Sequence, residues 1–292
     1  MKFAALLCFL IATLTLAGRT FGQGLTLPGQ RQVGGELVTI RGILDQAVIA
    51  PGQTFNLAII FEIKPKWHIY WRNPGAGAAA PEIDITAPQG FEVLETRWPR
   101  PQVLKSQTGD VYAYDDQAVL FVPIKAPPVL EEGRVRIEAA VSWAVCDDQV
   151  CKLGSGTCAA TAQTVSASAP QPRPDARLDR YLPRFPKPIE TAAQAGASFD
   201  GATLTVVAPA QGHDAARIIS DLTPGVVFGE PQITIESDRV TARVPIEVQP
   251  QNSLGEKMVV AGLLMLGDRS EDPSFEFRIP VDESKSKVDG AR

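Results

Sequence analysis

The chain has 292 residues, 45% of them hydrophobic and 21% charged, and its formal net charge is -5. This composition excludes global disorder, and the length suits two domains of ordinary size. The acidic balance argues against nucleic acid and anionic membrane surfaces as partners, because both require concentrated Lys and Arg. Gly and Pro occur 24 times each and helical periodicity is scarce, so many short strands and turns are expected.

The first segment has the pattern of a secretory signal peptide. Lys2 supplies a positive charge, the apolar run from Phe3 to Leu16 follows, and small residues come next. A membrane anchor is the alternative, but this run is short for a bilayer span. We therefore predict that residues 1–23 are removed. The mature chain is then exported, has no stable membrane insertion and carries a charge of about -7. Its cysteines would lie in a compartment where disulfides persist.

Residues 24–167 are predicted to form one domain, in which a flexible lead-in precedes strand signals with frequent turns from Glu36 onward. Between Thr54 and Ile63, alternate residues place four large apolar side chains on one face, namely Phe55, Leu57, Ile59 and Phe61. The run from Trp67 to Trp71 holds four large rings, including His68 and Tyr70. These rings could close one end of a core or flank a reactive group, and both can hold because alternate strand residues face opposite sides. Trp98-Pro99-Arg100-Pro101 predicts a stiff surface loop, since prolines remove ladder donors.

The spacing of these strands predicts an antiparallel sandwich of immunoglobulin type. Residues 168–195 are rich in proline and predict an extended linker with a short helix at Asp175 to Tyr181. Strand signals return over residues 196–281, which predict a second, smaller β-sandwich, and residues 282–292 form a charged tail. The predicted fold class is therefore all-β, with one sandwich following the other.

An alternating apolar run, Val135, Ile137, Ala139 and Val141, predicts a strand with one inward face that leads into a segment of cysteines. These cysteines are the candidate reactive groups. Cys146 and Cys151 are separated by four residues, a spacing that can bring two Cα atoms within reach of a disulfide. Closing so short a loop removes little entropy from the unfolded chain, so such a bridge would be a weak staple. This comparison favours a redox-active pair over the alternative, a passive bridge in a hairpin.

Charges beside the two sulfurs differ. Asp147 and Asp148 should disfavour the thiolate of Cys146, whereas Lys152 should favour that of Cys151. We therefore predict that Cys151 exchanges with a partner and that Cys146 is the resolving thiol.

Cys158 is an extra thiol in this segment. It is either buried, reactive or intermolecular, or it pairs with one of the other two cysteines, with Gly154-Ser155-Gly156 as a loop that gives the freedom to do so. The three cysteines of this segment and the only two histidines in the chain, His68 and His213, make a poor zinc set, and scarce Met and His argue against copper. We expect no metal and no cofactor.

Four motifs in order carry a family resemblance: Trp67 to Gly75 (WHIYWRNPG), Trp98 to Pro101 (WPRP), the strand pair from Tyr112 to Ile124, and Trp143 to Cys151 (W-x-V-C-x4-C). Together they resemble the periplasmic N-terminal domain of the thiol:disulfide interchange protein DsbD, especially its ScsB-like relatives. The resemblance covers residues 36–165. The extra Cys158, and Lys152-Leu153-Gly154 where the family often has proline, depart from the pattern.

The resemblance implies an immunoglobulin-like domain in the periplasm whose pair, Cys146 and Cys151, relays electrons to or from protein thiols. It implies an activity like that of a protein-disulfide reductase. It also implies that Tyr70 and His68 stand beside the pair and shield it, and that Trp98 and Pro99 form a cap over it. The expected partners are thioredoxin-like or Dsb-type proteins and a membrane electron transporter on a separate chain. The alternative is a non-catalytic binding or assembly protein with a purely structural disulfide.

Overall fold

The structure is a computed structural model that describes residues 36–166, 174–248 and 258–281. The predicted signal peptide, the charged tail and the start of the predicted linker lie outside these residues. Within the described ranges, no helix is long and apolar enough to cross a membrane.

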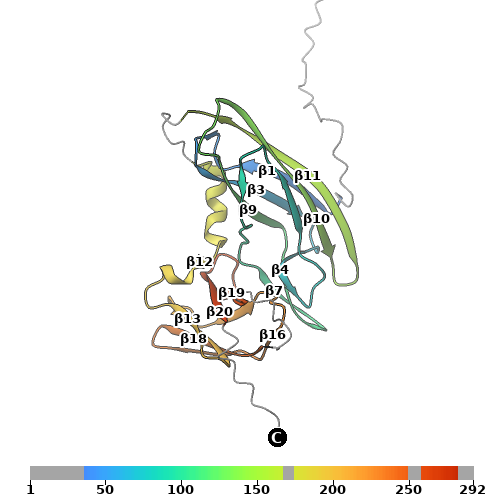
Figure 1. The fold of residues 1–292 in the computed structure, drawn as a ribbon. Coiled ribbons are helices and arrows are strands. Elements are labelled where there is room, and N and C mark those ends of the chain that lie inside the picture. The colour runs from blue at the N-terminus through green and yellow to red at the C-terminus, as the bar shows by residue number, and fades with distance from the viewer. Residues whose placement is uncertain (1–35, 167–173, 249–257, 282–292) are drawn as a thin grey trace, which may run out of the picture. The chain divides into compact units, whose positions relative to one another are not determined.

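The first part of the chain forms two four-stranded sheets that enclose one core (Figure 1). The first sheet has the order β1 (Val38–Leu44), β3 (Thr54–Ile63), β9 (Gln117–Lys125), β6 (Glu92–Val93). The second has the order β2 (Val48–Ile49), β11 (Cys151–Thr164), β10 (Gly133–Cys146), β5 (Glu82–Thr86). A smaller third sheet has the order β4 (Ile69–Gly75), β8 (Gly109–Tyr114), β7 (Gln102–Ser106).

Period-two alternation in the sequence accounts for this core. The predicted inward residues of β3 are all fully buried: Phe55, Leu57, Ile59 and Phe61. Those of β10 are buried in the same core: Val135, Ile137, Ala139 and Val141. The predicted all-β fold, with an immunoglobulin-like sandwich first, is therefore confirmed.

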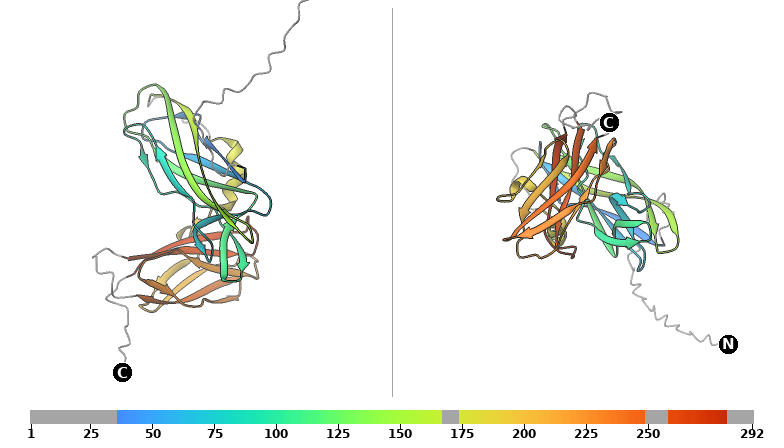
Figure 2. Two further views of the ribbon diagram at one scale, coloured as in Figure 1. Left: turned by 90° about the vertical axis from the view of Figure 1, so that its right-hand side faces the viewer. Right: turned by 90° about the horizontal axis from the view of Figure 1, so that it is seen from below.

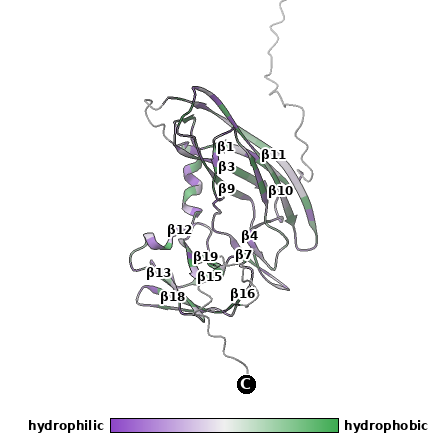
Figure 3. Ribbon diagram, viewed as in Figure 1, coloured by the Kyte–Doolittle hydropathy of each residue, from purple (hydrophilic) through white to green (hydrophobic). Residues whose placement is uncertain are grey.

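The outer face of β3 and β9 is covered as well. The 3-10 helix η1 (Ala176–Arg184), which carries both hydrophilic and hydrophobic residues (Figure 3), buries Leu178 and Tyr181 against Ala58 and Ile60. Just beyond it, the ring of Phe185 stacks on Phe121 at 4.6 Å. The short helix predicted at Asp175 to Tyr181 is thus present as η1. Its packing on the first sandwich was not predicted, and its apolar residues cover a second apolar face of β3 and β9.

The last part of the chain forms two further sheets, whose strands lie in two layers (Figure 2). One has the order β12 (Lys187–Pro188), β20 (Ser274–Val281), β19 (Met258–Leu266), β15 (Ala216–Ser220). The other has the order β13 (Gly196–Phe199), β14 (Thr203–Pro209), β18 (Arg239–Val248), β16 (Val226–Phe228), and β17 (Gln232–Glu236) also pairs with β18. The one-turn helix η2 (Ile189–Thr191) precedes β13. These elements enclose a second apolar core.

Two local predictions were wrong. The segment around Pro99 is buried rather than a surface loop, because the Arg100 guanidinium donates to backbone carbonyls of Leu266, Gly267, Asp272 and Pro273. Residues 154–156 are not a loop but part of β11, where they pair with Trp143, Ser142 and Val141. Gly154 is required there, because a Cβ would lie 2.4 Å from the Trp143 Nε1.

Candidate functional site

The candidate site lies at the tip of the long hairpin formed by β10 and β11. The two strands pair antiparallel without a register shift from Gly133↔Thr164 to Cys146↔Cys151. Residues 147–150 close the turn, and the Asp147 carboxylate accepts hydrogen bonds from the backbone N–H groups of Gln149 (2.9 Å) and Val150 (2.8 Å). These bonds lower the pKa of Asp147, so its carboxylate form holds the turn.

Cys146 and Cys151 form a disulfide across this hairpin, with Cα atoms 4.1 Å apart. The two cysteines differ in exposure: Cys146 is 1% exposed, whereas Cys151 is an exposed residue. Only one sulfur of the bridge is therefore accessible to a large partner.

Cys158 is a free, buried thiol. It pairs with Ala139, whose side chain belongs to the main core, whereas Cys146 belongs to a separate apolar cluster. Because side chains alternate along a strand, Cys158 lies on the opposite face of the sheet from the disulfide. Burial raises its pKa to about 11. Of the pairings that the sequence left open, the structure thus has Cys146–Cys151 and keeps Cys158 apart.

His68 and Tyr70 lie beside the disulfide. His68 and Cys146 exchange backbone hydrogen bonds of 2.9 and 3.0 Å, so they are directly opposite and their side chains share a face. Tyr70, two residues along, shares that face and packs with Cys146, whereas Ile69 and Trp71 enter the main core. Both interpretations of the ring-rich run therefore hold, each for alternate residues.

Residues that were not predicted complete the cover over the disulfide. Leu104 on β7, together with Val111 and Ala113 on β8, packs in the same cluster as Tyr70 and Cys146. Gly77 lies against the ring of Tyr70, where a Cβ would be 2.3 Å from a ring carbon. The run of small residues from Ala76 to Ala80 was the sequence signal for this close approach.

An open cavity of about 610 Å³ lies next to the hairpin turn. It is lined by Lys66, Trp67, His68, Leu104, Asp115, Asp147, Asp148 and Gln149. Burial lowers the pKa of His68, and this outweighs the opposite effect of Asp148, Asp115 and Asp147. The cavity therefore offers a largely neutral imidazole beside several carboxylates.

Lys152 does not direct its charge at Cys151 as its position in the sequence suggested. It lies on the other face of β11, opposite Val145. Its ammonium group sits 5.4 Å from the centre of the Trp67 ring and 3.9 Å from the Glu36 carboxylate. The difference in exposure, rather than this charge, distinguishes the two sulfurs.

The contacts described for Trp98 and Pro99 are with groups other than the disulfide. The half-buried Trp98 packs against the main core and lines a cavity with Arg72 and Phe185. The Pro99 carbonyl accepts a 2.8 Å hydrogen bond from the Tyr114 hydroxyl. None of these contacts joins Trp98 or Pro99 to the disulfide, so the shielding role expected for them stays a prediction.

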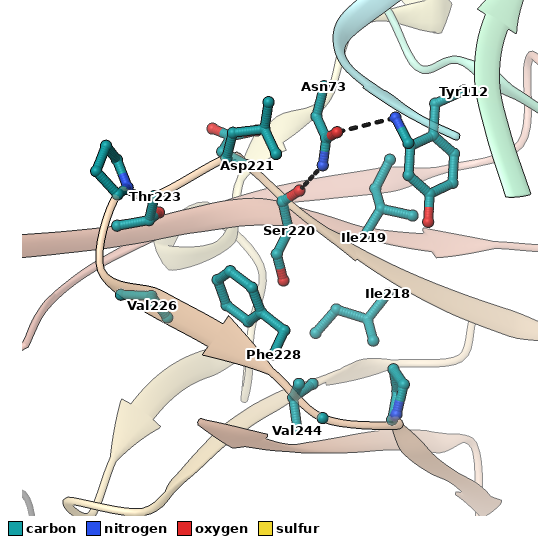
Figure 4. Close-up of a pocket in the computed structure, with 15 residues that line it drawn as sticks. Asn73, Tyr112, Ile218, Ile219, Ser220, Asp221, Thr223, Val226, Phe228 and Val244 are labelled. Carbon is teal, nitrogen blue, oxygen red and sulfur yellow. Dashed lines mark hydrogen bonds between the residues drawn. The ribbon is translucent and has the colours of Figure 1, made fainter. Parts of the chain in front are cut away.

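A second cavity, of about 570 Å³, lies among β15, β16 and the end of β4 (Figure 4). Its lining is largely apolar, with Ile218, Phe228 and Val244, and it holds no cysteine or histidine. The Asn73 amide spans its rim: Nδ2 donates to the Ser220 carbonyl (2.5 Å), and Oδ1 accepts from the Gly75 N–H (2.9 Å). This cavity offers no group for thiol chemistry.

Comparison with known families identifies the part of the chain that carries the disulfide. Residues 43–163 match the model described as the N-terminal region of the thiol:disulfide interchange protein DsbD. They form a DsbD N-terminal-like domain. The DsbD N-terminal-like domain contains both bridged cysteines, His68, Tyr70 and Leu104, and it relates the chain to a family of thiol–disulfide exchange. Residues 183–262 match a domain of unknown function, DUF8393.

Solved structures add a likeness in fold. The N-terminal periplasmic domain of ScsB from Proteus mirabilis has a TM-score of 0.54 and 18% identity, over 88% of this chain and 96% of that one. The major pilin subunit BcpA of Bacillus cereus has a TM-score of 0.27 and 8% identity, over 85% of this chain and 67% of that one. Among curated proteins, no match was found.

Proposed function

We propose that this chain is a thiol–disulfide exchange module that relays electrons through Cys146 and Cys151. The observation that carries the proposal is the asymmetry of the bridge, with one exposed sulfur and one buried sulfur at the tip of a rigid hairpin. A partner thiolate can reach only Cys151, which makes Cys151 the exchanging sulfur and Cys146 the resolving one.

The mechanism is exchange through a mixed disulfide. A partner thiolate attacks the Cys151 sulfur, the bond to Cys146 breaks, and its electron pair leaves on the Cys146 sulfur. A second thiolate of the partner then releases Cys151 as a thiol and takes the disulfide with it. In the opposite half-cycle the reduced pair passes two electrons to a disulfide of a substrate protein.

The proposed partners and location follow from the DsbD N-terminal-like domain. Domains of this family interact with thioredoxin-like Dsb proteins, so we propose a thioredoxin-like reductant, supplied in turn by a membrane electron transporter on a separate chain. The likeness to a periplasmic domain and the pattern of residues 1–23 support a periplasmic location.

A redox titration tests the proposal. The full chain without its signal segment is equilibrated in dithiothreitol buffers of known potential, and the free thiols are counted by mass after alkylation. We expect the pair to titrate above about -300 mV, the range in which labile rather than structural disulfides lie. A pair that stays oxidised well below that potential would show a structural bridge and overturn the relay.

Trapping tests the roles of the two sulfurs. The variant Cys146→Ala should accumulate a mixed disulfide with thioredoxin through Cys151, since the resolving thiol is gone. The matched control, Cys151→Ala, should trap nothing comparable. A mixed disulfide formed through Cys158 in the first variant would contradict the assignment.

A further inference from the structure

A hydroxyl and an imidazole form a chain of polar groups that ends at the exposed sulfur. The Tyr70 hydroxyl oxygen lies 4.0 Å from the Cys151 Sγ and 3.3 Å from the His68 Nε2. The two rings meet edge to face, with centroids 5.3 Å apart. A tyrosine hydroxyl can accept one proton and donate another at the same time, so it can connect the other two groups.

We propose that Tyr70 transfers the proton of the Cys151 thiol, and that His68 is the positioning residue that takes up this proton through the Tyr70 hydroxyl. The inference rests on the proposed thiol–disulfide exchange and deepens it. It assigns Tyr70 a catalytic role and His68 a role in directing the proton, beyond the shielding that the sequence predicted for both.

In the direction that reduces a substrate, Cys151 loses its proton and attacks in one concerted step. The Cys151 S–H proton passes to the Tyr70 oxygen as the Tyr70 proton passes to the His68 Nε2. The sulfur's electron pair attacks the substrate disulfide, a mixed disulfide forms, and one substrate thiolate leaves and takes the proton from His68. The Cys146 thiol then gives up its proton, and its thiolate attacks the Cys151 sulfur and restores the bridge. The second substrate sulfur leaves and takes up the proton that Cys146 lost. Two electrons leave the pair and two protons accompany them.

The surroundings of His68 suit this step. Its strand partner, Cys146, fixes the backbone through two hydrogen bonds, and the ring is half-buried at the edge of the open cavity. The charged groups that line this cavity with His68 are Asp147 and Asp148 on the turn, Asp115 after β8, and Lys66 before β4. The carboxylates stabilise the imidazolium that forms, and burial keeps the ring neutral beforehand.

The arrangement on the sheet also explains why these two residues serve this sulfur. His68 and Tyr70 stand on the face that carries the bridge, whereas the intervening Ile69 is buried in the main core. The backbone of β4 and of His68, the residue just before it, therefore fixes both polar side chains next to the disulfide. Tyr70 is 3% exposed, so packing holds its side chain in place.

The rate of Cys151 with a small disulfide tests the relay without a protein partner. The chain without residues 1–23, which hold Cys8, is reduced in a Cys158→Ala background, and its second-order rate constant with 4,4′-dithiodipyridine is followed from about pH 4 to about pH 10. We expect Tyr70→Phe to slow the reaction about tenfold or more at neutral pH, the size expected for a hydrogen bond to a charged group. In the wild type, we expect the rate constant to rise with pH already below the pKa of the Cys151 thiol. His68→Gln should lose this part of the rise.

Matched controls come from the chain itself. Tyr112→Phe removes the hydroxyl of a tyrosine that packs on Trp71, and His213→Gln removes the second histidine, so both should keep the wild-type profile. Because Tyr70 is buried, its variant is compared only after urea unfolding shows a folded state. The half-buried His68 supplies an independent variant.

The outcomes separate this inference from the proposed function. If Tyr70→Phe and His68→Gln both follow the wild-type profile, the relay is wrong, whereas the exchange function stands. If the wild-type pair fails the redox titration, the exchange function falls first. A uniform loss of rate at every pH in His68→Gln would show a structural effect and would also refute the relay.

Discussion

Reduction of the Cys146–Cys151 bridge should leave the protein folded and only slightly less stable. The bridge joins residues five apart in the sequence, so it closes a loop of about six residues. The chain-entropy relation gives about 2 kcal/mol for a loop of that size, and native-state strain can only lower the gain. Domains of this kind are stable by about 5–15 kcal/mol, so the loss is tolerable.

The hairpin supplies the rest of the reason. Each strand of the hairpin has 14 residues, and all of them pair in one register, so the two cysteines remain opposite each other when the bond is broken. A reduced pair that stays in register can close again quickly, as a relay requires.

Urea unfolding of the oxidised and reduced protein, followed by circular dichroism, measures this difference. We expect parallel transitions with the same slope and a loss of about 2 kcal/mol on reduction. The Cys151→Ala variant is the control and should not respond to the reductant. If reduction unfolds the protein, or costs more than about 4 kcal/mol, the bridge is a structural staple and the reasoning from loop length is refuted.

Two further predictions concern β11. Gly154→Ala should lower the free energy of unfolding by about 1–3 kcal/mol, because the new methyl group meets the buried Trp143 ring, and an unchanged urea midpoint would contradict this. The raised pKa of Cys158 means that the folded state holds this proton more tightly than the unfolded state. Its contribution to stability is therefore complete below about pH 9 and is lost as the pH rises towards about 11. The difference in stability between wild type and Cys158→Ala should shift in that direction over this range, and a flat difference would show that the thiol is not buried.

The alternation of apolar residues along the sequence predicted which side chains of the strands are buried. The inward residues of β3 and β10 follow from alternation alone, because a strand with one buried face must place every second side chain in the core. The same rule allowed Trp71 to enter the core while Tyr70 faced the disulfide, so the ring-rich run could serve both purposes.

Contacts between residues far apart in the sequence could not be predicted from it. Arg100 is buried because carbonyls more than 160 residues away accept its hydrogen bonds, and no local pattern around Pro99 and Pro101 indicates those acceptors. Gly154 suggested a loop because glycine is common in loops, whereas here it makes room for the Trp143 ring on the neighbouring strand. A glycine marks close approach as well as flexibility, and only the partner strand decides between them.

The candidate site likewise combines local features that the sequence indicates with contacts that only the tertiary structure sets. Spacing made a bridge between Cys146 and Cys151 possible, since the turn that joins them is local, but it left a pairing with Cys158 open. The cover of Leu104, Val111 and Gly77 comes from β7, β8 and the segment after β4, and their register with the hairpin is set by tertiary structure. Sequence therefore indicated the reactive pair but not the apolar residues around it.

The assignment of Cys151 as the exchanging sulfur now depends on geometry rather than on neighbouring charges. Lys152 follows Cys151 in sequence, but successive residues of a strand face opposite sides, so its ammonium group is near Trp67 and Glu36. The residues that share a face with Cys151 come instead from the partner strands, including Cys146 and, one strand further, His68 and Tyr70. In a β-hairpin the chemical neighbours of a sulfur are its cross-strand residues. One polar group beside Cys151 accordingly comes from β4, where the Tyr70 hydroxyl oxygen lies 4.0 Å from its sulfur.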